Sequence, residues 1–483
     1  MVMGSSPAQT APPETDDDDQ YTDVESVHSD NEEDHEDYRK GGYHPVAIGD
    51  RLGDGRYIIV RKLGWGHFST VWLARDTILN AHVALKIVKS AKDFTQSALE
   101  EIKLLDKIKK TNPESPGYQY VAQLLHHFWH TGPNGKHVCM AFEVLGESLL
   151  SLIKRYNYRG IPQSIVKRIS KQIIQGLDYL HRECGVIHTD LKPENVLVWI
   201  PNVEEYLQQE TASVLEQIAV TAEPEPTVST AGMSNSRRKR LRRKKKKKEE
   251  KQAKEAKEAK EKEENNDNTN NTNEDLENKV SSLTLTDDAK NTKIKTSVLD
   301  FTATASETEG STQAFDQIVV KIADLGNACW VDGDYTHIIQ TRQYRSPEVL
   351  VGQKWTDRAD MWSMACLVFE LLTGDFLFDP RPGQKFNKDD DHLAQIIELM
   401  RVVPRSLTTG GEFSSEFFNR KGELRHIKKL RYRRLRDVLH DSFLMPPAEA
   451  DSVSSFLSPM LEVDMTKRLS AGEMLNHAWL RDI

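Results

Sequence analysis

One short stretch of the chain, residues 187–197 (IHTDLKPENVL), holds three side chains that could together transfer a phosphoryl group. They are the carboxylate of Asp190, the ammonium of Lys192 and the carboxamide of Asn195. A carboxylate can accept the proton of a substrate hydroxyl, an ammonium can neutralise the transferring group, and a carboxamide oxygen can ligate Mg²⁺. Asp324, in a later IADLG motif, would add a second oxygen ligand for the metal.

A glycine-bearing segment closer to the N-terminus, LGWGHFSTV, could cover a polyphosphate. Glycine lets the backbone approach phosphate oxygens closely and donate N–H groups, although two glycines also suit an ordinary hairpin turn. Lys86 favours the phosphate interpretation, because an ammonium 22 residues after Gly64 on a third strand can reach α- and β-phosphate oxygens. The predicted nucleotide-binding loop consists of Leu63, Gly64, Trp65, Gly66, His67, Phe68, Ser69, Thr70 and Val71.

A lysine that leaves water needs a counter-ion, and the helix predicted at residues 96–108 offers two glutamates. Glu101 shares a helical face with apolar side chains, whereas Glu100 lies on a stripe with lysines. Glu101 is therefore the predicted partner of Lys86. The alternative is a solvated glutamate on an exposed helix face, which is the commoner place for this residue type.

The elements that must position these side chains change character along the chain. Short β-like runs separated by turn residues predict an antiparallel meander at residues 57–60, 70–73 and 83–88. Two further strands are predicted at residues 121–125 and 136–143. Two long apolar stripes then predict helices at residues 164–182 and 359–372, the second apolar on nearly all sides and therefore buried. A β-rich segment before a helix-rich one indicates an α+β protein with two unlike lobes.

Two stretches lack the apolar residues that a core requires, and opposed charge blocks lie behind the net charge of −9. Residues 1–38 contain no Lys or Arg, whereas eleven of the twelve residues at 237–248 are Lys or Arg. The predicted domains are an acidic disordered tail (1–40), a small sheet lobe, or N-lobe (41–146), a larger helical lobe, or C-lobe, in two pieces (147–200 and 317–483), and a disordered insert (201–316). The apolar runs on either side of the insert could still pair as a hairpin, since closure entropy grows only logarithmically with loop length.

Cysteine usage and hydropathy bear on the cellular compartment. The four cysteines are widely spaced and form no metal-binding pairs, and no secretory leader is evident, which favours a reducing intracellular compartment. No run of 18 apolar residues is present, so no membrane partner is expected.

Taken together, these motifs make residues 51–200 and 317–483 resemble the eukaryotic protein kinases. The resemblance implies a two-lobed kinase fold, ATP and Mg²⁺ as cofactors, and adenine held by the backbone around Glu143 and Leu145. It also implies that Glu348, in an SPE motif, pairs with Arg468. The expected catalytic residues are Asp190, Lys192, Lys86 and Glu101, and the expected metal ligands are Asn195 and Asp324.

A narrower resemblance rests on QTRQYRSPE at residues 340–348, the HTD triplet, GWGHFS and the long insert. These features are similar to the SR-protein kinases of the CMGC group, which phosphorylate serines in the Arg-Ser repeats of splicing and mRNA-handling proteins. The resemblance implies an acidic docking groove at Asp375, Asp391 and Glu398, although Ser442 stands where that family has a docking lysine. Thr189 replaces the arginine that would bind an activating phosphate, so no phosphorylation of the activation segment should be required.

The basic run at residues 237–248 has three open interpretations: it could enter a nuclear import receptor, bind RNA, or keep the insert extended and soluble. The kinase interpretation requires no direct nucleic-acid contact and predicts a monomer in both cytoplasm and nucleus with Arg-Ser-rich proteins as substrates. The alternatives are a dual-specificity kinase of splicing factors, a non-catalytic scaffold with a kinase fold, and a nucleic-acid binder acting through the insert.

Overall fold

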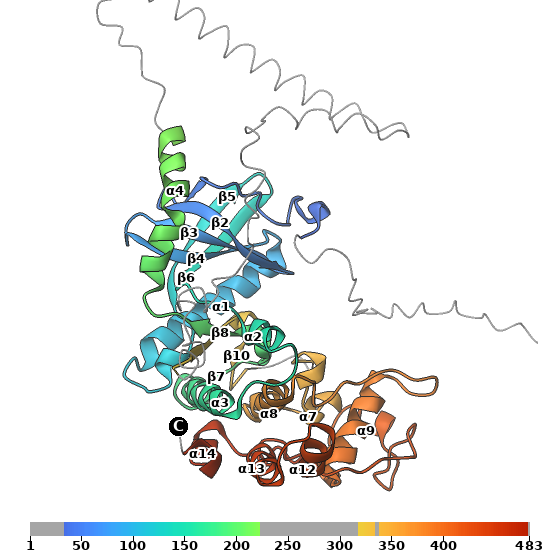
Figure 1. The fold of residues 1–483 in the computed structure, drawn as a ribbon. Helices are drawn as coiled ribbons and strands as arrows, with labels where there is room; N and C mark the ends of the chain where they lie inside the picture. Colours follow the sequence, from blue (N-terminus) through green and yellow to red (C-terminus); the bar gives the residue numbers. More distant parts are fainter. Residues whose placement is uncertain (1–32, 223–316, 334–337, 482–483) are drawn as a thin grey trace, which may run out of the picture.

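The computed structural model describes residues 33–222, 317–333 and 338–481, which form a sheet lobe above a larger helical lobe (Figure 1). The predicted α+β, two-lobed architecture is confirmed. Most of the predicted insert, residues 223–316, lies outside the described residues. No helix in the described part of the chain combines the length and the apolar character that crossing a bilayer requires.

The sheet lobe is built on six antiparallel strands in the order β1-β2-β3-β4-β6-β5. Their bounds are Arg51–Leu52, Tyr57–Gly66, Ser69–Asp76, Ala81–Val88, Leu124–Gly132 and Gly135–Phe142, for β1 to β6 in turn. The predicted meander is confirmed. The strand predicted at 121–125 starts later and runs longer, because LLHHFWHTG alternates buried and more exposed residues as an edge strand does.

Helix α1 (Lys92–Thr111) packs against this sheet through Ala98, Leu105 and Ile108, on the same face that carries Glu101. The helical lobe surrounds α8 (Arg358–Thr373), in which nearly every residue is buried. Around it lie α2 Leu149–Arg155, α3 Gln163–Asp178, α7 Pro347–Leu350, α9 Lys388–Met400, α10 Arg405–Thr409, α11 Ser414–Phe417, α12 Leu435–Asp437, α13 Pro447–Leu457 and α14 Ala471–Met474.

Strands β8 (Val196–Trp199) and β9 (Val319–Ile322) pair antiparallel across the insert, with Val196 opposite Ile322. The predicted long-range hairpin is therefore confirmed. Asn195 precedes the first of these strands and Asp324 follows the second, so antiparallel pairing brings the two residues to the same end. A backbone bond from the Ala323 N–H to the Asn195 carbonyl oxygen, at 2.8 Å, fixes this juxtaposition.

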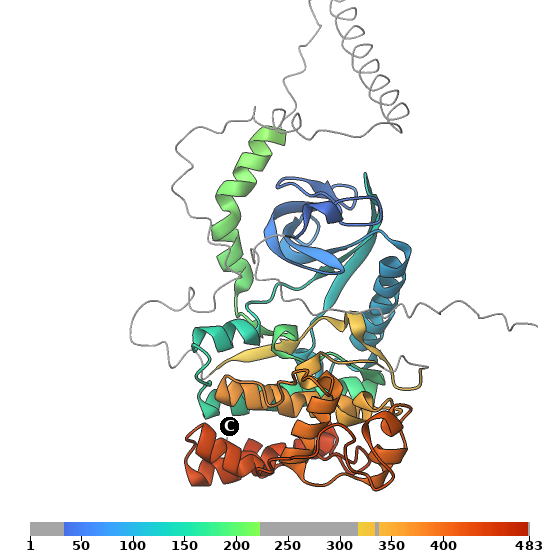
Figure 2. The ribbon, with the colours of Figure 1, turned by 90° about the vertical axis from the view of Figure 1, so that its right-hand side faces the viewer.

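Two segments predicted to be disordered are ordered against the sheet lobe. Residues 203–222 of the predicted insert form α4 (Val203–Ala222), which stands beside the sheet on the side opposite α1 (Figure 2). Its Leu207 is fully buried in a cluster with Val60 and Leu73 of the sheet. Apolar contact with the lobe therefore stabilises a helix whose apolar residues are not gathered into a marked stripe.

The last residues of the predicted acidic tail, 33–40, also pack on the sheet lobe. Lys62 binds the Glu33 carboxylate, which is buried, and Lys89 binds Asp37 at 2.7 Å. The acidic composition of the tail predicted self-repulsion, but its final carboxylates meet lysines of the folded lobe.

Candidate active site

The predicted catalytic loop follows the short strand β7 (Val186–Ile187) and holds its three side chains in mutual contact. Lys192 Nζ lies 3.0 Å from Asp190 Oδ2. Asn195 donates its amide N–H to the Asp190 carbonyl oxygen at 2.8 Å and to Asp190 Oδ2 at 3.3 Å. The amide nitrogen of Asn195 is therefore occupied, which leaves its oxygen, the atom suited to a hard cation.

Buried Asp360 on α8 anchors the backbone of this loop. Its carboxylate accepts the His188 N–H at 2.8 Å and the Thr189 N–H at 2.9 Å, immediately before Asp190. His181 contributes a third bond through Nε2, at 2.8 Å. Burial acts to raise the pKa of Asp360, but these hydrogen bonds and the neighbouring histidine charges outweigh it, so the pKa lies below its ordinary value.

Thr341 is a site residue that the sequence analysis missed. Its hydroxyl donates to Asp190 Oδ1 at 2.7 Å and accepts from Lys192 Nζ at 2.8 Å, and its N–H also points to Asp190 Oδ1, at 3.1 Å. The preceding Gln340 has a left-handed backbone (φ 70°) and a buried amide that bonds the carbonyl of Ala359. The only sequence signal was the position of Thr341 inside the QTRQYRSPE motif.

Lys86 and Glu101 form a bidentate contact, with Nζ 2.9 and 3.0 Å from the two carboxylate oxygens. The structure thus places Glu101, not Glu100, against the lysine, as the apolar face of α1 requires. Asp324 Oδ1 lies 3.4 Å from the same Nζ. Burial would lower the pKa of Lys86, but the two carboxylates reverse this and raise it, while the Lys86 charge lowers the pKa of Asp324.

The glycine-bearing loop forms the end of the β2–β3 hairpin, where Gly66 pairs with Ser69 around a turn. A Cβ placed on Gly64 or Gly66 would meet no atom within 4 Å, so both glycines face open space in which a ligand could lie. Val71 pairs with Lys86 across β3 and β4, which sets the lysine one strand away from the loop. Of the other predicted loop residues, Trp65, His67 and Phe68 are exposed, Ser69 and Thr70 are buried, and Leu63 is half-buried.

Glu143 and Leu145 lie in the connection that leaves β6 for the helical lobe. The Glu143 carboxylate accepts from Lys321 Nζ at 2.8 Å and from the Gln123 N–H at 2.9 Å. Its side chain therefore ties the two lobes together, while Leu145 is half-buried. The backbone of this connection is the part that would face adenine.

The donor set suits Mg·ATP. Asp324 keeps its carboxylate about half exposed (53%), and Asn195 lies at the same end of the β8–β9 pair, with its amide nitrogen rather than its oxygen bonded to Asp190. The oxygens of both residues could therefore serve one hard cation. The charged amine of Lys86 and the open glycines would meet the phosphates.

The three predicted docking carboxylates lie on the helical lobe outside this site. Asp375 is exposed beyond α8, whereas Asp391 and Glu398 lie on α9, which a capping box starts. Asp391 Oδ2 accepts the Arg381 N–H at 2.9 Å, and Glu398 Oε1 accepts the Arg431 N–H at 2.7 Å. Both carboxylates are therefore partly engaged within the chain.

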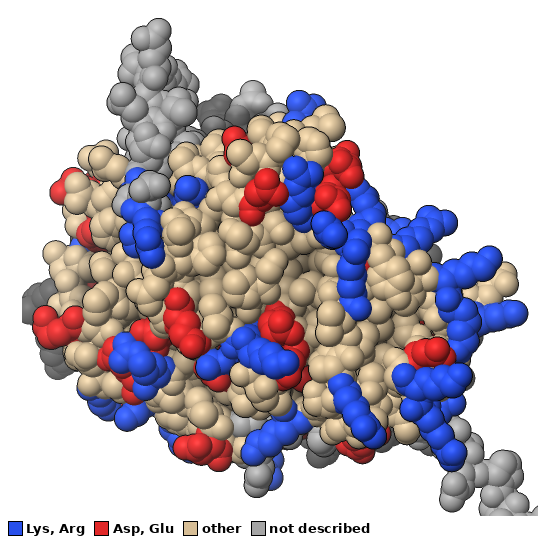
Figure 3. Space-filling view, turned by 90° about the horizontal axis from the view of Figure 1, so that it is seen from below, with Lys and Arg blue, Asp and Glu red and all other residues tan. Residues whose placement is uncertain are grey.

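A basic segment adjoins Glu398, since residues 420–436 carry nine Lys or Arg and one Glu. On the face of the molecule seen from below, Lys and Arg side chains gather toward one end and acidic side chains are interspersed elsewhere (Figure 3). Ser442, at the position where the resembling family has a docking lysine, accepts from the Arg433 guanidinium at 3.0 Å. The positive charge beside Ser442 therefore comes from Arg433.

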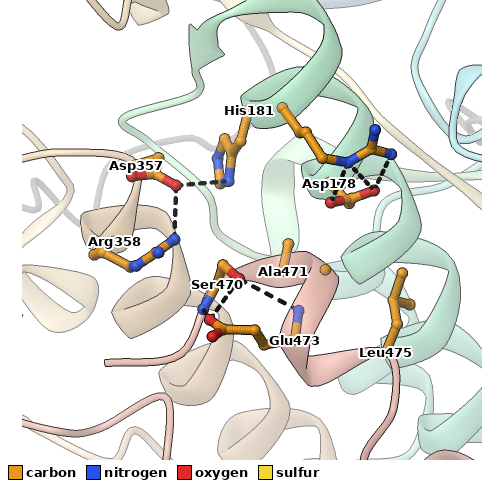
Figure 4. A pocket seen from close by; sticks show the side chains of 10 residues that line it. Asp178, His181, Asp357, Arg358, Ser470, Ala471, Glu473 and Leu475 are labelled. Atoms are coloured by element: carbon orange, nitrogen blue, oxygen red, sulfur yellow. Dashed lines mark hydrogen bonds and ion pairs between the residues drawn. The ribbon is translucent and has the colours of Figure 1, made fainter. Parts of the chain in front are cut away.

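A second hollow, of about 540 Å³, contains none of the predicted site residues. It is lined by the end of α3 with the helical turn Tyr179–Cys184 that follows it, by the start of α8 and by α14, and its side chains include His181, Asp357 and Glu473 (Figure 4). Most of its polar side chains are paired within the wall, as in the Asp357–Arg358 contact at 2.8 Å. His181 connects the wall of the hollow to the catalytic loop through its bond to Asp360.

Comparison with known proteins agrees with this geometry. The family described as "Protein kinase domain" matches residues 57–204 and 311–480, on both sides of the insert. "Protein kinase dsk1" of Schizosaccharomyces pombe is 45% identical, over 95% of this chain and 87% of its own length. "Serine/threonine-protein kinase SKY1" of Saccharomyces cerevisiae is 38% identical over 95% and 79%, and human "SRSF protein kinase 3" is 40% identical over 93% and 90%.

Proposed function

Because the chain belongs to the protein kinase family and, within it, to the SR-protein kinases, we propose that it transfers the γ-phosphate of ATP to serines in Arg-Ser-rich splicing and mRNA-handling proteins. It is a serine/threonine protein kinase; the substrate class, the metal and the residue roles are the proposal. The observation that carries it is the convergence of Asp190, Lys192 and Asn195 on one loop beside the Lys86–Asp324 pair.

Each residue has a role that its contacts support. Asp190 would accept the proton of the serine hydroxyl, and Thr341 and Lys192 hold its carboxylate in one orientation. The Lys192 ammonium would offset negative charge that develops on the transferring group. The oxygens of Asn195 and Asp324 would hold the cation of Mg·ATP, which would supply the phosphoryl group when bound.

The Arg-Ser preference is supported by the carboxylates beside the site and by the relatives. An arginine-rich ligand forms charge-assisted bonds with carboxylates, and the predicted groove offers Asp375, Asp391 and Glu398. The human relative is named as a kinase of SRSF proteins. Asp391 accepts from the Arg381 backbone N–H and from the Gln395 side-chain amide, and Glu398 accepts from the Arg431 backbone N–H. These donors are uncharged, so the negative charge of both carboxylates stays available to a guanidinium.

The catalytic proposal is tested with purified protein, Mg·ATP and an Arg-Ser peptide. Asp190→Ala should lower kcat by about 10²–10⁴-fold, as expected for loss of a general base, while Mg·ATP binding is kept. Asp451→Ala is the control, because Asp451 is exposed and its only described ion pair is with Arg436. If Asp190→Ala kept the phosphoryl transfer activity of the wild type, the role of Asp190 as general base would be refuted. If the wild type itself transferred no phosphate, the non-catalytic scaffold would be favoured.

The docking proposal is tested by charge reversal. Asp391→Lys combined with Glu398→Lys should raise KM for an Arg-Ser peptide by about tenfold or more and leave kcat nearly unchanged, because the contacts form equally in ground and transition states. Asp451→Lys carries the same kind of change on an exposed residue of α13. Equal KM values in the three proteins would count against the groove.

Two further measurements separate the remaining alternatives. Phosphotyrosine formation, or preference for an acidic peptide, would indicate a dual-specificity kinase. Deletion of residues 223–316 should leave peptide phosphorylation intact, whereas a nucleic-acid binder acting through the insert would lose its function.

Localisation in both cytoplasm and nucleus is proposed from the basic run at residues 237–248. Neutralising that run should shift a fluorescently tagged protein toward the cytoplasm. An unchanged distribution would leave the run without an import role.

A further inference from the structure

The tip of the glycine-bearing loop is held by a residue far outside it. Tyr43, in the segment that precedes β1, donates its hydroxyl hydrogen to the Gly66 carbonyl oxygen at 2.8 Å. The Tyr43 side chain is almost completely buried (2% exposed), so its ring is fixed by packing and the hydroxyl has a defined direction. Burial raises the pKa of Tyr43 to about 12, so the hydroxyl keeps its proton, and remains a donor, at neutral pH.

Tyr43 is in turn held by charged and backbone contacts. Lys89 Nζ lies 4.3 Å from the centre of its ring and pairs with Asp37 at 2.7 Å. The Tyr43 carbonyl oxygen accepts from Asn134 Nδ2 at 2.7 Å, and the Gly42 carbonyl oxygen accepts the Ser90 N–H at 3.2 Å. The segment is therefore fastened to the ends of β4 and of the β5–β6 hairpin before it reaches the loop.

The other side of the same turn is held by the Lys89 backbone and by α1. The Phe68 carbonyl oxygen accepts the Lys89 N–H at 2.9 Å, and the Phe68 ring meets Phe94 of α1 edge-on, with centroids 5.6 Å apart. The turn is thus bound on one side to α1, which carries Glu101, and on the other to Tyr43. A loop held at both sides loses less conformational freedom when a ligand orders it.

Peptide geometry connects the Tyr43 bond to phosphate binding. The Gly66 carbonyl and the His67 N–H belong to one planar trans peptide, so they point in opposite directions. When Tyr43 binds the carbonyl, the His67 N–H is directed away from the Tyr43 hydroxyl. A Cβ at the neighbouring Gly66 would meet no atom within 4 Å, so a ligand has room beside this peptide. Glycine restricts its backbone less than other residues do, so the Tyr43 bond adds a constraint on this peptide to the pairing of Gly66 with Ser69.

We propose that Tyr43 is a positioning residue for ATP, whose hydroxyl fixes the Gly66–His67 peptide so that its N–H is presented to the nucleotide phosphates. The inference rests on the proposed function, because it assigns the glycine-bearing loop to ATP. It extends the nucleotide site to Tyr43, a residue that the motifs did not include.

The test is direct binding of Mg·ATP by calorimetry, together with steady-state kinetics on a serine peptide, for full-length wild type, Tyr43→Phe and Tyr38→Phe. Phenylalanine keeps the buried ring of residue 43 and removes only its hydroxyl. Tyr38→Phe makes the same change five residues earlier, where the hydroxyl binds Glu33. The expected result for Tyr43→Phe is a three- to tenfold increase in Kd and in KM for ATP, the range of one neutral hydrogen bond, with kcat and peptide KM within about twofold of wild type.

The outcomes separate the inference from the proposed function. The role of Tyr43 would be overturned if Tyr43→Phe bound Mg·ATP as tightly as the wild type, or if Tyr38→Phe weakened binding by the same factor. Either result would leave the kinase assignment intact. If Tyr43→Phe lowered Tm and kcat without a selective rise in KM for ATP, Tyr43 would have a purely structural role, and the proposed positioning role would be overturned. Wild-type protein that does not bind Mg·ATP would overturn both proposals.

Discussion

Replacement of Asp360 by Asn should damage both stability and catalysis, because one buried carboxylate holds the catalytic loop. The side chain is fully buried and accepts three hydrogen bonds, from two backbone N–H groups and from His181. A bond to a charged acceptor contributes about 1.5–3 kcal/mol, roughly twice a neutral bond. An amide would lose one of the three bonds and weaken the other two by about half, so the free energy of unfolding should fall by roughly 3–6 kcal/mol.

The same substitution should lower kcat by about 10²-fold, since the two N–H groups precede Asp190 directly and a displacement of about 1 Å can have that effect. Urea unfolding followed by tryptophan fluorescence measures the stability, and peptide phosphorylation measures kcat. Asp357→Asn is the matched control, because Asp357 precedes the same helix, is partly exposed and binds Arg358 in a surface pair, which contributes at most about 1 kcal/mol. Its contact with His181 is long, at 3.8 Å, compared with 2.8 Å from His181 to Asp360.

The pH dependence of Asp360→Asn provides an independent check. Because the pKa of Asp360 is lowered in the folded protein, its stabilisation is complete above the ordinary value of 3.8 and is lost as pH falls through the lowered value. The difference between wild type and variant should therefore be constant from pH 5 to 7 and shrink in stronger acid. The reasoning would be refuted if Asp360→Asn kept the stability and kcat of the wild type, or if Asp357→Asn lost as much stability and kcat as Asp360→Asn.

Two further substitutions test the surroundings of the site. Thr341→Val removes the hydroxyl between Asp190 and Lys192 and should lower kcat about tenfold with unchanged ATP KM in steady-state assays; recovery in Thr341→Ser would confirm the hydroxyl, and an unaltered kcat in the valine variant would exclude it. Burial raises the pKa of Glu370 to about 7, against an opposing bond from Tyr344, so its ionisation destabilises the fold as pH rises from about 4.5 to 7. Glu370→Gln should remove this loss and be the more stable protein at pH 8 by about 2–4 kcal/mol in urea unfolding, and a difference independent of pH would contradict the assignment.

Much of the fold followed from local patterns. The alternating strands and the two apolar helical stripes predicted both lobes, because side-chain periodicity records which face of each element is buried. The pairing of β8 with β9 was also predictable, since two apolar runs needed partners on either side of a polar insert. The register and full length of β5 were not, because an edge strand exposes half of its residues and its polar positions look like a loop.

The sequence by itself determined the chemical groups: a catalytic loop of adjacent residues, a lysine and a helical glutamate on an apolar face, and a second aspartate. Only the tertiary structure decided which distant groups hold them in place, namely Asp360, Thr341 and Tyr43. It also ordered α4, which composition had predicted to be disordered. The physical reason is that spacing along the chain records local periodicity, whereas a hydrogen bond or ion pair between remote elements depends on packing that brings them within about 3 Å.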